Sequence, residues 1–219
     1  MSTTSTTTPG TSHPGADRLA YGELEISFDD RVLRPRPWTA AQSRWAADLL
    51  RTAPPGPVLE LCSGAGHIGL LAVHGSRRHL VCVDANPAAT ELTAANARAA
   101  GMADRVETRE GWIRDVLRAG ETFPLVVADP PWVPAAETGR FPEDPLLAID
   151  GGEDGLVVVR EVLQALRQHL APGGVALLQL GTAAQAEAVG EALRDSGLVP
   201  GELREYGDRG VLLRLDRPA

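Results

Sequence analysis

Lysine is absent from this 219-residue chain, so all 21 basic residues are arginines. This absence excludes chemistry that needs a lysine amine, such as a Schiff base or the phosphate-binding lysine of a P-loop. Cysteine is nearly absent too: Cys62 and Cys82 lie in apolar stretches and lack the spacing of metal ligands. We therefore expect buried thiols in a reducing cytoplasm and no metal site.

Long apolar runs are also missing. No stretch has the length of a transmembrane helix, and the Ser/Thr/Pro/Gly-rich segment 1–16 lacks the apolar centre of a signal peptide. We expect a disordered tail over 1–16, then one soluble domain over 17–219 without membrane association. The net charge of −8 argues against tight nucleic-acid binding by counterion release, although a local basic groove stays open.

The sequence does contain a regular alternation of strand and helix patterns. Strands are predicted near 24–28, 58–62, 79–83, 105–109, 124–128 and 174–181, with two more near 201–215. Helices are predicted near 66–74, 87–100, 156–170 and 183–195, and one more begins at a capping box formed by Thr39 and Gln42. This alternation predicts an α/β fold with a doubly wound, mostly parallel sheet.

A glycine-rich turn follows the strand predicted at 58–62. Gly64, Gly66 and Gly69 have the spacing of a dinucleotide fingerprint, and Asp84 stands twenty residues after Gly64, as a ribose-binding acid does. Glycines allow a close approach of the backbone to a ligand, and a helix N-terminus offers free N–H groups. The turn alone fits NAD(P) as well as a methionine-derived sulfonium donor.

Glu60 favours the sulfonium donor. A carboxylate at this strand end is poorly placed beside a pyrophosphate but well placed for an ammonium group. The expected cofactor is therefore S-adenosyl-L-methionine, with NAD(P) as the alternative. The residues expected to bind it are Glu60, Cys62, Ser63, Gly64, Ala65, Gly66, Ile68, Asp84, Ala85, Asn86, Gly111, Trp112 and Asp129.

The tetrapeptide Asp129-Pro130-Pro131-Trp132 follows the apolar run 124–128, which is typical of a buried parallel strand. The Asp129 carboxylate and the Pro130 carbonyl can accept hydrogen bonds from an NH2 group and direct its lone pair toward a methyl donor. Trp132 offers a flat face to a planar, partly cationic acceptor. Two prolines fix this geometry, so these four residues are the predicted catalytic group.

Several segments together resemble class I S-adenosylmethionine-dependent methyltransferases, namely 60–66, 83–84 and 129–132. Segments 148–156 and 170–174 resemble the "G-G-x-D-G-L" and "L-x-P-G-G" motifs of the release-factor glutamine methyltransferases, the HemK-like family. The resemblance implies a seven-stranded Rossmann-like sheet and an N-methyltransferase. Its implied acceptor is a planar nitrogen, foremost a glutamine side-chain amide of a protein.

The chain departs from that family at particular positions. Asp129 and Trp132 replace the Asn and Tyr of N-P-P-Y, and Gly111 replaces the Asp before Trp112. Segment 34–37 resembles the family's "P-R-P-E-T", but Trp38 replaces its Glu.

The substrate residues expected from the sequence are Arg36, Trp38 and Trp132. No counterpart of the family's N-terminal helical domain is expected. A small amine or N-heterocycle, a nucleobase amino group and a non-catalytic binding module therefore stay open, as does the oligomeric state.

Overall fold

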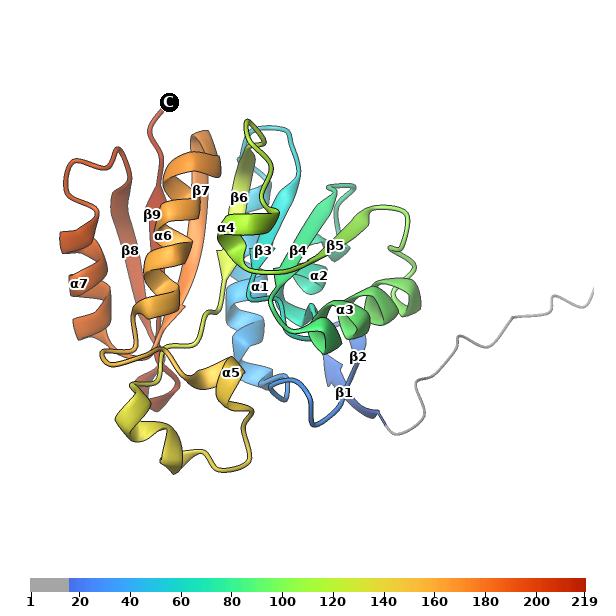
Figure 1. Cartoon of the computed structure of the whole chain (residues 1–219). Coiled ribbons are helices and arrows are strands. Elements are labelled where there is room, and N and C mark those ends of the chain that lie inside the picture. Colours follow the sequence, from blue (N-terminus) through green and yellow to red (C-terminus); the bar gives the residue numbers. More distant parts are fainter. Residues whose placement is uncertain (1–15) are drawn as a thin grey trace, which may run out of the picture.

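The computed structural model describes residues 16–219, and its centre is a seven-stranded sheet of order β5-β4-β3-β6-β7-β9-β8 (Figure 1). Neighbours from β5 to β7 pair in parallel, whereas β9 is antiparallel to both β7 and β8. The strands are β3 Val58–Leu61, β4 Leu80–Asp84, β5 Val106–Glu110, β6 Phe123–Ala128, β7 Leu170–Leu180, β8 Val199–Glu205 and β9 Val211–Asp216. The predicted doubly wound, mostly parallel sheet is confirmed.

Helices cover both faces of this sheet, and a separate hairpin precedes it (Figure 1). The α-helices are α1 Ala40–Leu50, α2 His67–His74, α3 Pro87–Ala99, α4 Ile113–Val116, α5 Leu146–Ile149, α6 Val157–His169 and α7 Ala183–Ala192. The remaining elements are β1 Asp17–Tyr21, β2 Leu24–Phe28 and the 3-10 turns η1 Pro37–Thr39, η2 Ala135–Arg140 and η3 Gly207–Arg209. Within residues 16–219, no helix is both long enough and apolar enough to span a bilayer. The tail expected over 1–16 lies outside the described residues, except for Ala16.

The side-chain alternation of the strands divides the core into two layers. In β3, Val58 belongs to the core cluster that also contains residues of α1, α2, α3 and the hairpin. Leu59 and Leu61 belong to the cluster on the other face, together with residues of α4, α6 and α7. Every residue of β3 and β6 is buried, as expected for central parallel strands covered on both sides. The carboxyl ends of these strands therefore open between two rigid layers.

The predicted start of α3 is confirmed in detail. Asn86 is the N-cap, its side-chain oxygen accepts a hydrogen bond from Ala88 N at 3.0 Å, and Pro87 occupies the first helical position.

The predicted capping box at Thr39 is wrong. Thr39 already has helical backbone angles because η1 precedes it, and its hydroxyl donates to the Arg36 carbonyl instead of capping α1. The Gln42 side chain is fully buried and donates to the Ala128 and Leu177 carbonyls at 3.0 and 3.1 Å. Gln42 therefore provides hydrogen bonds to carbonyls of β6 and β7 and not to the N-terminus of α1.

The start of β7 also differs from the prediction. The strand begins at Leu170, four residues before the predicted 174, and a register shift between Phe123 and Leu125 of β6 accommodates Pro172-Gly173-Gly174 as an irregularity within the strand. Gly173 has a φ of 70°, and its N–H donates to the Arg217 carbonyl, which holds the irregularity in place.

Candidate active site

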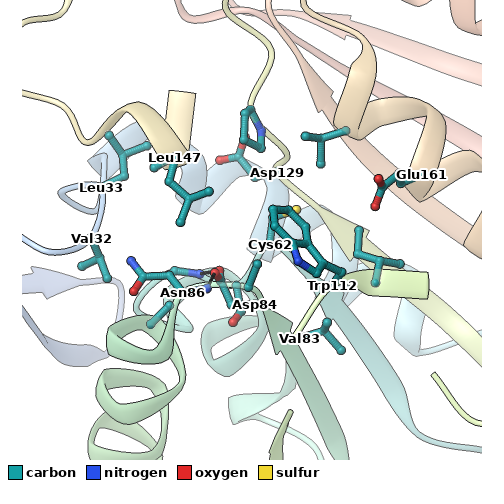
Figure 2. A pocket seen from close by; sticks show the side chains of 18 of the residues that line it. Val32, Leu33, Cys62, Val83, Asp84, Asn86, Trp112, Asp129, Leu147 and Glu161 are labelled. Atoms are coloured by element: carbon teal, nitrogen blue, oxygen red, sulfur yellow. Dashed lines mark hydrogen bonds between the residues drawn. The ribbon is translucent and has the colours of Figure 1, made fainter. Parts of the chain in front are cut away.

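A cavity of about 600 Å3 lies at the carboxyl ends of β3, β4 and β6 (Figure 2). Open α/β sheets bind ligands at this edge. The structure brings these residues predicted from the sequence together in its wall: Cys62, Ser63, Gly64, Ile68, Asp84, Ala85, Asn86, Gly111, Trp112, Asp129 and Pro131. The other predicted residues lie outside that wall, namely Glu60, Ala65, Gly66, Pro130, Trp132, Arg36 and Trp38.

The glycine turn between β3 and α2 is built from left-handed backbone. Cys62, Gly64 and Gly66 have φ values of 58°, 51° and 76°. A Cβ on Gly66 would stand 2.7 Å from the Thr93 methyl carbon, so this position has room only for glycine. Gly66 therefore shapes the turn from beneath, although it does not itself face the cavity.

The expectation that Glu60 binds the ammonium group directly is corrected by its position. Glu60 is 2% exposed, and its carboxylate accepts hydrogen bonds from Gly69 N at 2.9 Å and from the Cys82 thiol at 3.3 Å. Burial raises the pKa of Glu60 to about 7. Because its side chain points toward α2 and not toward the cavity, Glu60 supports the turn from below.

Asp84 stands at the end of β4 and faces the cavity. Its carboxylate accepts hydrogen bonds from Gly64 N at 2.8 Å and from Asn86 N at 2.9 Å, which fixes its orientation. Burial raises the pKa of the Asp84 carboxyl, whereas these backbone hydrogen bonds lower it. A carboxylate held in this way is suited to accept hydrogen bonds from a ribose diol.

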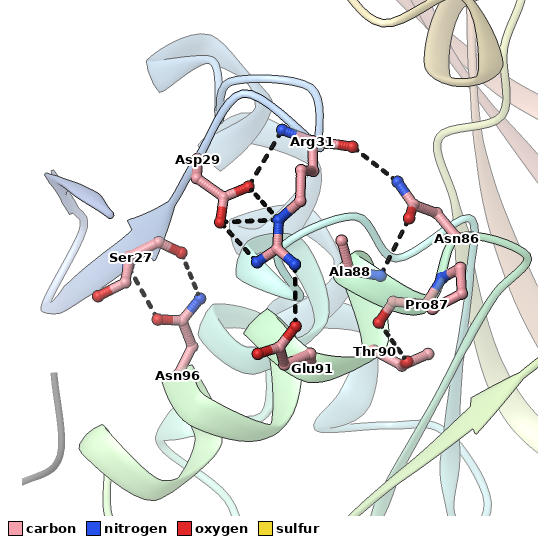
Figure 3. Close-up of polar contacts among 9 residues, drawn as sticks. All are labelled: Ser27, Asp29, Arg31, Asn86, Pro87, Ala88, Thr90, Glu91 and Asn96. Atoms are coloured by element: carbon pink, nitrogen blue, oxygen red, sulfur yellow. Dashed lines mark hydrogen bonds and ion pairs between the residues drawn. The ribbon is translucent and has the colours of Figure 1, made fainter. Parts of the chain in front are cut away.

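A segment before α1 closes one side of the cavity with Val32 and Leu33. Arg31 fastens it to α3, because its guanidinium bonds Asp29 and Glu91 while its carbonyl accepts from Asn86 Nδ2 at 2.7 Å (Figure 3).

The hairpin β1–β2 is fastened to the same helix. The Asn96 side chain pairs with both the N–H and the carbonyl of Ser27 (Figure 3). Helix α3 therefore holds the hairpin through Asn96 and the apolar side wall of the cavity through Asn86.

Trp112 lines the cavity on the side away from Val32 and Leu33 and is 48% exposed (Figure 2). The Arg114 guanidinium lies 5.8 Å from the centre of its ring and bonds the Glu161 carboxylate at 2.9 Å. A flat, accessible indole next to this ion pair provides a stacking surface for a base.

Asp129 follows β6 directly, and its carboxylate points into the cavity (Figure 2). Within residues 16–219 no group donates a hydrogen bond to it, and burial raises its pKa to about 7. Trp132 turns away: its ring lies against Gly181, where an added Cβ would be 2.3 Å from Cε3, and its carbonyl accepts from Gln185. Trp132 therefore borders the exit of β7 instead of lining the cavity.

Arg36 and Trp38 form a separate surface near the loop between β6 and α6. Arg36 pairs with Asp144 at 2.7 Å, and the guanidinium groups of Arg36 and Arg209 lie 5.8 and 5.4 Å from the centre of the Trp38 ring. Trp38 is 38% exposed, so its indole remains accessible beside two cations.

His67 and Ser63 contribute polar atoms to the site, and of the two only Ser63 is among the residues predicted from the sequence. His67 lines the cavity, packs edge-on against Tyr21 at 4.9 Å, and its Nε2 lies 3.3 Å from the Thr39 hydroxyl. Burial lowers the pKa of His67 to about 4, so the ring is neutral near pH 7. The Ser63 hydroxyl and His67 Nδ1 are buried without a hydrogen-bond partner in the described chain.

Other cavity residues were also missed by sequence reasoning. Leu33, Leu147, Val157 and Glu161 line the cavity from segments far apart in the chain, and no local motif marks them. The "A-I-D-G-G" resemblance at 148–152 was the one signal near the loop that carries Leu147. Two acids lie in the loop between β6 and α6: Asp150 lines the cavity, and Asp144 pairs with Arg36.

Comparisons with known proteins place these features in context. A family model described as "Conserved hypothetical protein 95" matches residues 34–141. A release factor glutamine methyltransferase of Moorella thermoacetica is 33% identical over 86% of this chain and 69% of its own length. A ribosomal protein uL3 glutamine methyltransferase of Bordetella pertussis is 32% identical over 70% of this chain and 53% of its own length.

The fold has solved counterparts as well. The catalytic domain of human Mettl16 bound to an RNA hairpin superposes with a TM-score of 0.71 at 14% identity, covering 89% of this chain and 74% of that one. At this identity the likeness concerns the fold alone. The chain spans about two thirds of the release-factor methyltransferases and about half of the uL3 methyltransferase.

Proposed function

Because the chain belongs to the HemK-like family of class I S-adenosylmethionine-dependent methyltransferases, we propose that it methylates the side-chain amide nitrogen of a glutamine in a protein. The observation that carries this proposal is the Asp129 carboxylate, which faces the cavity without a donor among the described residues. A primary amide has two N–H groups, one for Asp129 and one for the carbonyl of Pro130, which follows Asp129 directly although it is not part of the cavity wall. The relatives named for glutamine methylation support the same acceptor.

S-adenosylmethionine is the cofactor of this enzyme, and the NAD(P) alternative is set aside. The residues present fit such a molecule. The buried Ser63 hydroxyl still lacks a partner, Asp84 has free acceptor capacity toward the cavity, and Trp112 offers an open face. We propose that Asp84 binds the ribose, that Trp112 flanks the adenine, and that Ser63 and Gly64 contact the amino-acid part.

The cofactor supplies a methyl group on a positively charged sulfur, so the chain's own task is positioning and electrostatics. Asp129 and the Pro130 carbonyl accept the amide hydrogens and turn the nitrogen toward the methyl group. Leu33 and Leu147 line the cavity with apolar surface and limit the access of water. Trp38, with Arg36 and Arg209 beside its ring, contacts the acceptor protein outside the cavity.

A small-molecule amine is the second candidate acceptor. The observation that favours it is the excess of acids in the cavity wall, where Asp84, Asp129, Asp150 and Glu161 outnumber the single arginine, Arg114. A cationic amine is attracted to such a site, whereas a neutral amide is not.

The test is methyl transfer from radiolabelled S-adenosylmethionine to purified bacterial release factor and, separately, to ribosomal protein uL3. Label on a glutamine, located by peptide mass spectrometry, supports the proposal. Absence of label from both proteins, together with transfer to a metabolite fraction of cell extract, decides for the small amine.

A further inference from the structure

We propose that Asp129 is the general base of the reaction and takes up the proton that the acceptor nitrogen must lose. The inference rests on the proposed function as an N-methyltransferase and adds a second role to a residue assigned only to positioning. Two geometric observations carry it: the carboxylate points into the cavity, and no group among residues 16–219 donates a hydrogen bond to it. In addition, the one arginine of the cavity wall, Arg114, bonds Glu161.

The step balances in atoms and charge. The nitrogen lone pair forms the new N–C bond while the C–S bond breaks and its electron pair goes to sulfur. The nitrogen then carries a positive charge, its N–H bond breaks, and the electron pair of that bond returns to nitrogen. The proton binds an oxygen of Asp129, so a cation and a carboxylate become a neutral thioether and a neutral carboxylic acid.

The geometry separates Asp129 from the other two acids near the cavity. Asp84 accepts two backbone N–H groups, and Glu60 accepts Gly69 N and the Cys82 thiol. The Asp129 oxygens accept nothing within residues 16–219, yet they point into the cavity (Figure 2). Their lone pairs are thus available to the acceptor nitrogen, first for a hydrogen bond and then for the proton.

The surroundings raise the proton affinity of Asp129. Burial brings its pKa to about 7, close to the value at which a general base works best near neutral pH. The charge of Asp129 in turn raises the pKa values of Tyr21, Glu60 and Cys62, which shows that these groups lie in its field. No arginine contributes to the pKa of Asp129.

The titratable groups facing this region come from several packed elements: Tyr21 of β1, Glu60 of β3, Cys62 and His67 of the turn and α2, Asp84 of β4, Arg114 of α4, and Asp150 and Glu161 of the cavity wall. The guanidinium of Arg114 bonds the Glu161 carboxylate. Glu60 also has a pKa of about 7, whereas His67 is neutral above about pH 4. Glu60 is therefore the group that must be distinguished from Asp129 in any pH profile.

The first experiment measures the single-turnover rate from pH 5.5 to 9 with saturating S-adenosylmethionine and purified release factor. We expect the wild-type rate to rise through about pH 7, because the base must be ionised. Asp129→Asn keeps the shape but has no site for the proton, so the rate should fall about 100-fold and lose this inflection. Glu60→Gln should keep the inflection. An Asp129→Asn variant with wild-type rate and profile, or a Glu60→Gln variant that loses the inflection, overturns the proposal.

A second measurement does not depend on the acceptor. Infrared difference spectra of wild type minus Asp129→Asn, both with adenosylhomocysteine, report protonation of this one carboxyl. A midpoint near pH 7 supports the base, and a midpoint near the ordinary 3.8 overturns it. Failure to methylate either protein, by contrast, contradicts only the proposed acceptor.

Discussion

Asp84 and Asp129 stand at the same edge of the sheet, one after β4 and the other after β6, but their surroundings differ. Asp84 is held by Gly64 N and Asn86 N, whereas nothing among the described residues donates to Asp129. We call residues 60–69 and 84–86 the donor half of the site, and residues 34–38 and 129–132 the acceptor half. In the donor half the Asp84 carboxylate is held by backbone N–H groups, whereas in the acceptor half the Asp129 carboxylate is left for a substrate to complete.

Replacing Asp129 with Ala should have the largest effect of the substitutions that separate the two halves, and it should act on kcat. The variant loses both the amide hydrogen-bond acceptor and the proposed base, so kcat should fall about 1000-fold. The affinity for adenosylhomocysteine, measured by calorimetry, should stay within about threefold, because the donor half is untouched. Unchanged turnover would remove Asp129 from the catalytic group.

Replacing Asp84 with Ala should break the other half. The variant loses charge-assisted hydrogen bonds to the ribose, so the Kd for adenosylhomocysteine should rise about 10- to 100-fold. At saturating cofactor kcat should fall no more than about threefold, since Asp129 is unaffected. Glu187→Ala, an exposed position on α7, serves as the surface control. A large loss of kcat with unchanged Kd contradicts the division into halves.

The two exposed tryptophans provide a matched pair. Trp38→Ala should raise KM for an acceptor protein about tenfold and leave cofactor affinity unchanged, since Trp38 lies outside the cavity. Trp112→Ala should weaken cofactor binding about tenfold with little change in acceptor KM. Steady-state kinetics with release factor and calorimetry separate the two, and the same effect from both variants contradicts the assignment.

The smallest effect concerns Glu60 and stability. The pKa of the Glu60 carboxyl is about 7 in the folded chain and about 4.5 in the unfolded chain. Between pH 4.5 and pH 7 the carboxyl is therefore protonated mainly in the folded chain. The contribution of Glu60 to the free energy of unfolding is therefore largest below about pH 4.5 and is lost as the pH rises through 7.

Thermal melts of wild type and Glu60→Gln at pH 5 and pH 8 test this sign. The fall in Tm from pH 5 to pH 8 should be smaller by a few degrees in the variant. His67 has the opposite pH dependence. Because its pKa is lowered from 6.5 to about 4, its contribution to the free energy of unfolding is lost only as the pH falls from 6.5 toward 4. An equal fall in Tm in both proteins contradicts the buried, protonated state of Glu60.

The parts of the fold that sequence predicted well have local causes. Asn86-Pro87 specifies a helix start by itself, and the run 124–128 specifies a strand buried on both faces. The direction in which Glu60 points has a different cause, because Gly69 and Cys82 capture its carboxylate from the layer of α2 and from β4. Likewise, the position of Gln42 in the sequence is typical of a capping box, but in the fold its side chain donates to backbone carbonyls of β6 and β7.

The same distinction separates the remaining site residues. The turn residues Ser63 and Gly64 were recognised because glycine spacing is a local signal. Leu33 and Glu161 line the cavity because of how α3 and α6 pack in the fold, and no short sequence motif predicts that packing. Trp132 was predicted to contact the substrate because it follows Asp129-Pro130-Pro131 in the sequence. In the fold its ring packs against Gly181 instead.

The bridge made by Gln42 has a consequence for the order in which the molecule assembles. The donor half closes through short loops, from Glu60 to Gly69 and from Gly64 to Asp84, whereas Gln42 reaches Ala128 across 86 positions and Leu177 across 135. Loop closure costs more chain entropy as the separation grows. The glycine turn between β3 and α2 can therefore form early, and the strand end that carries Asp129 is fixed only when the chain's distant parts have met.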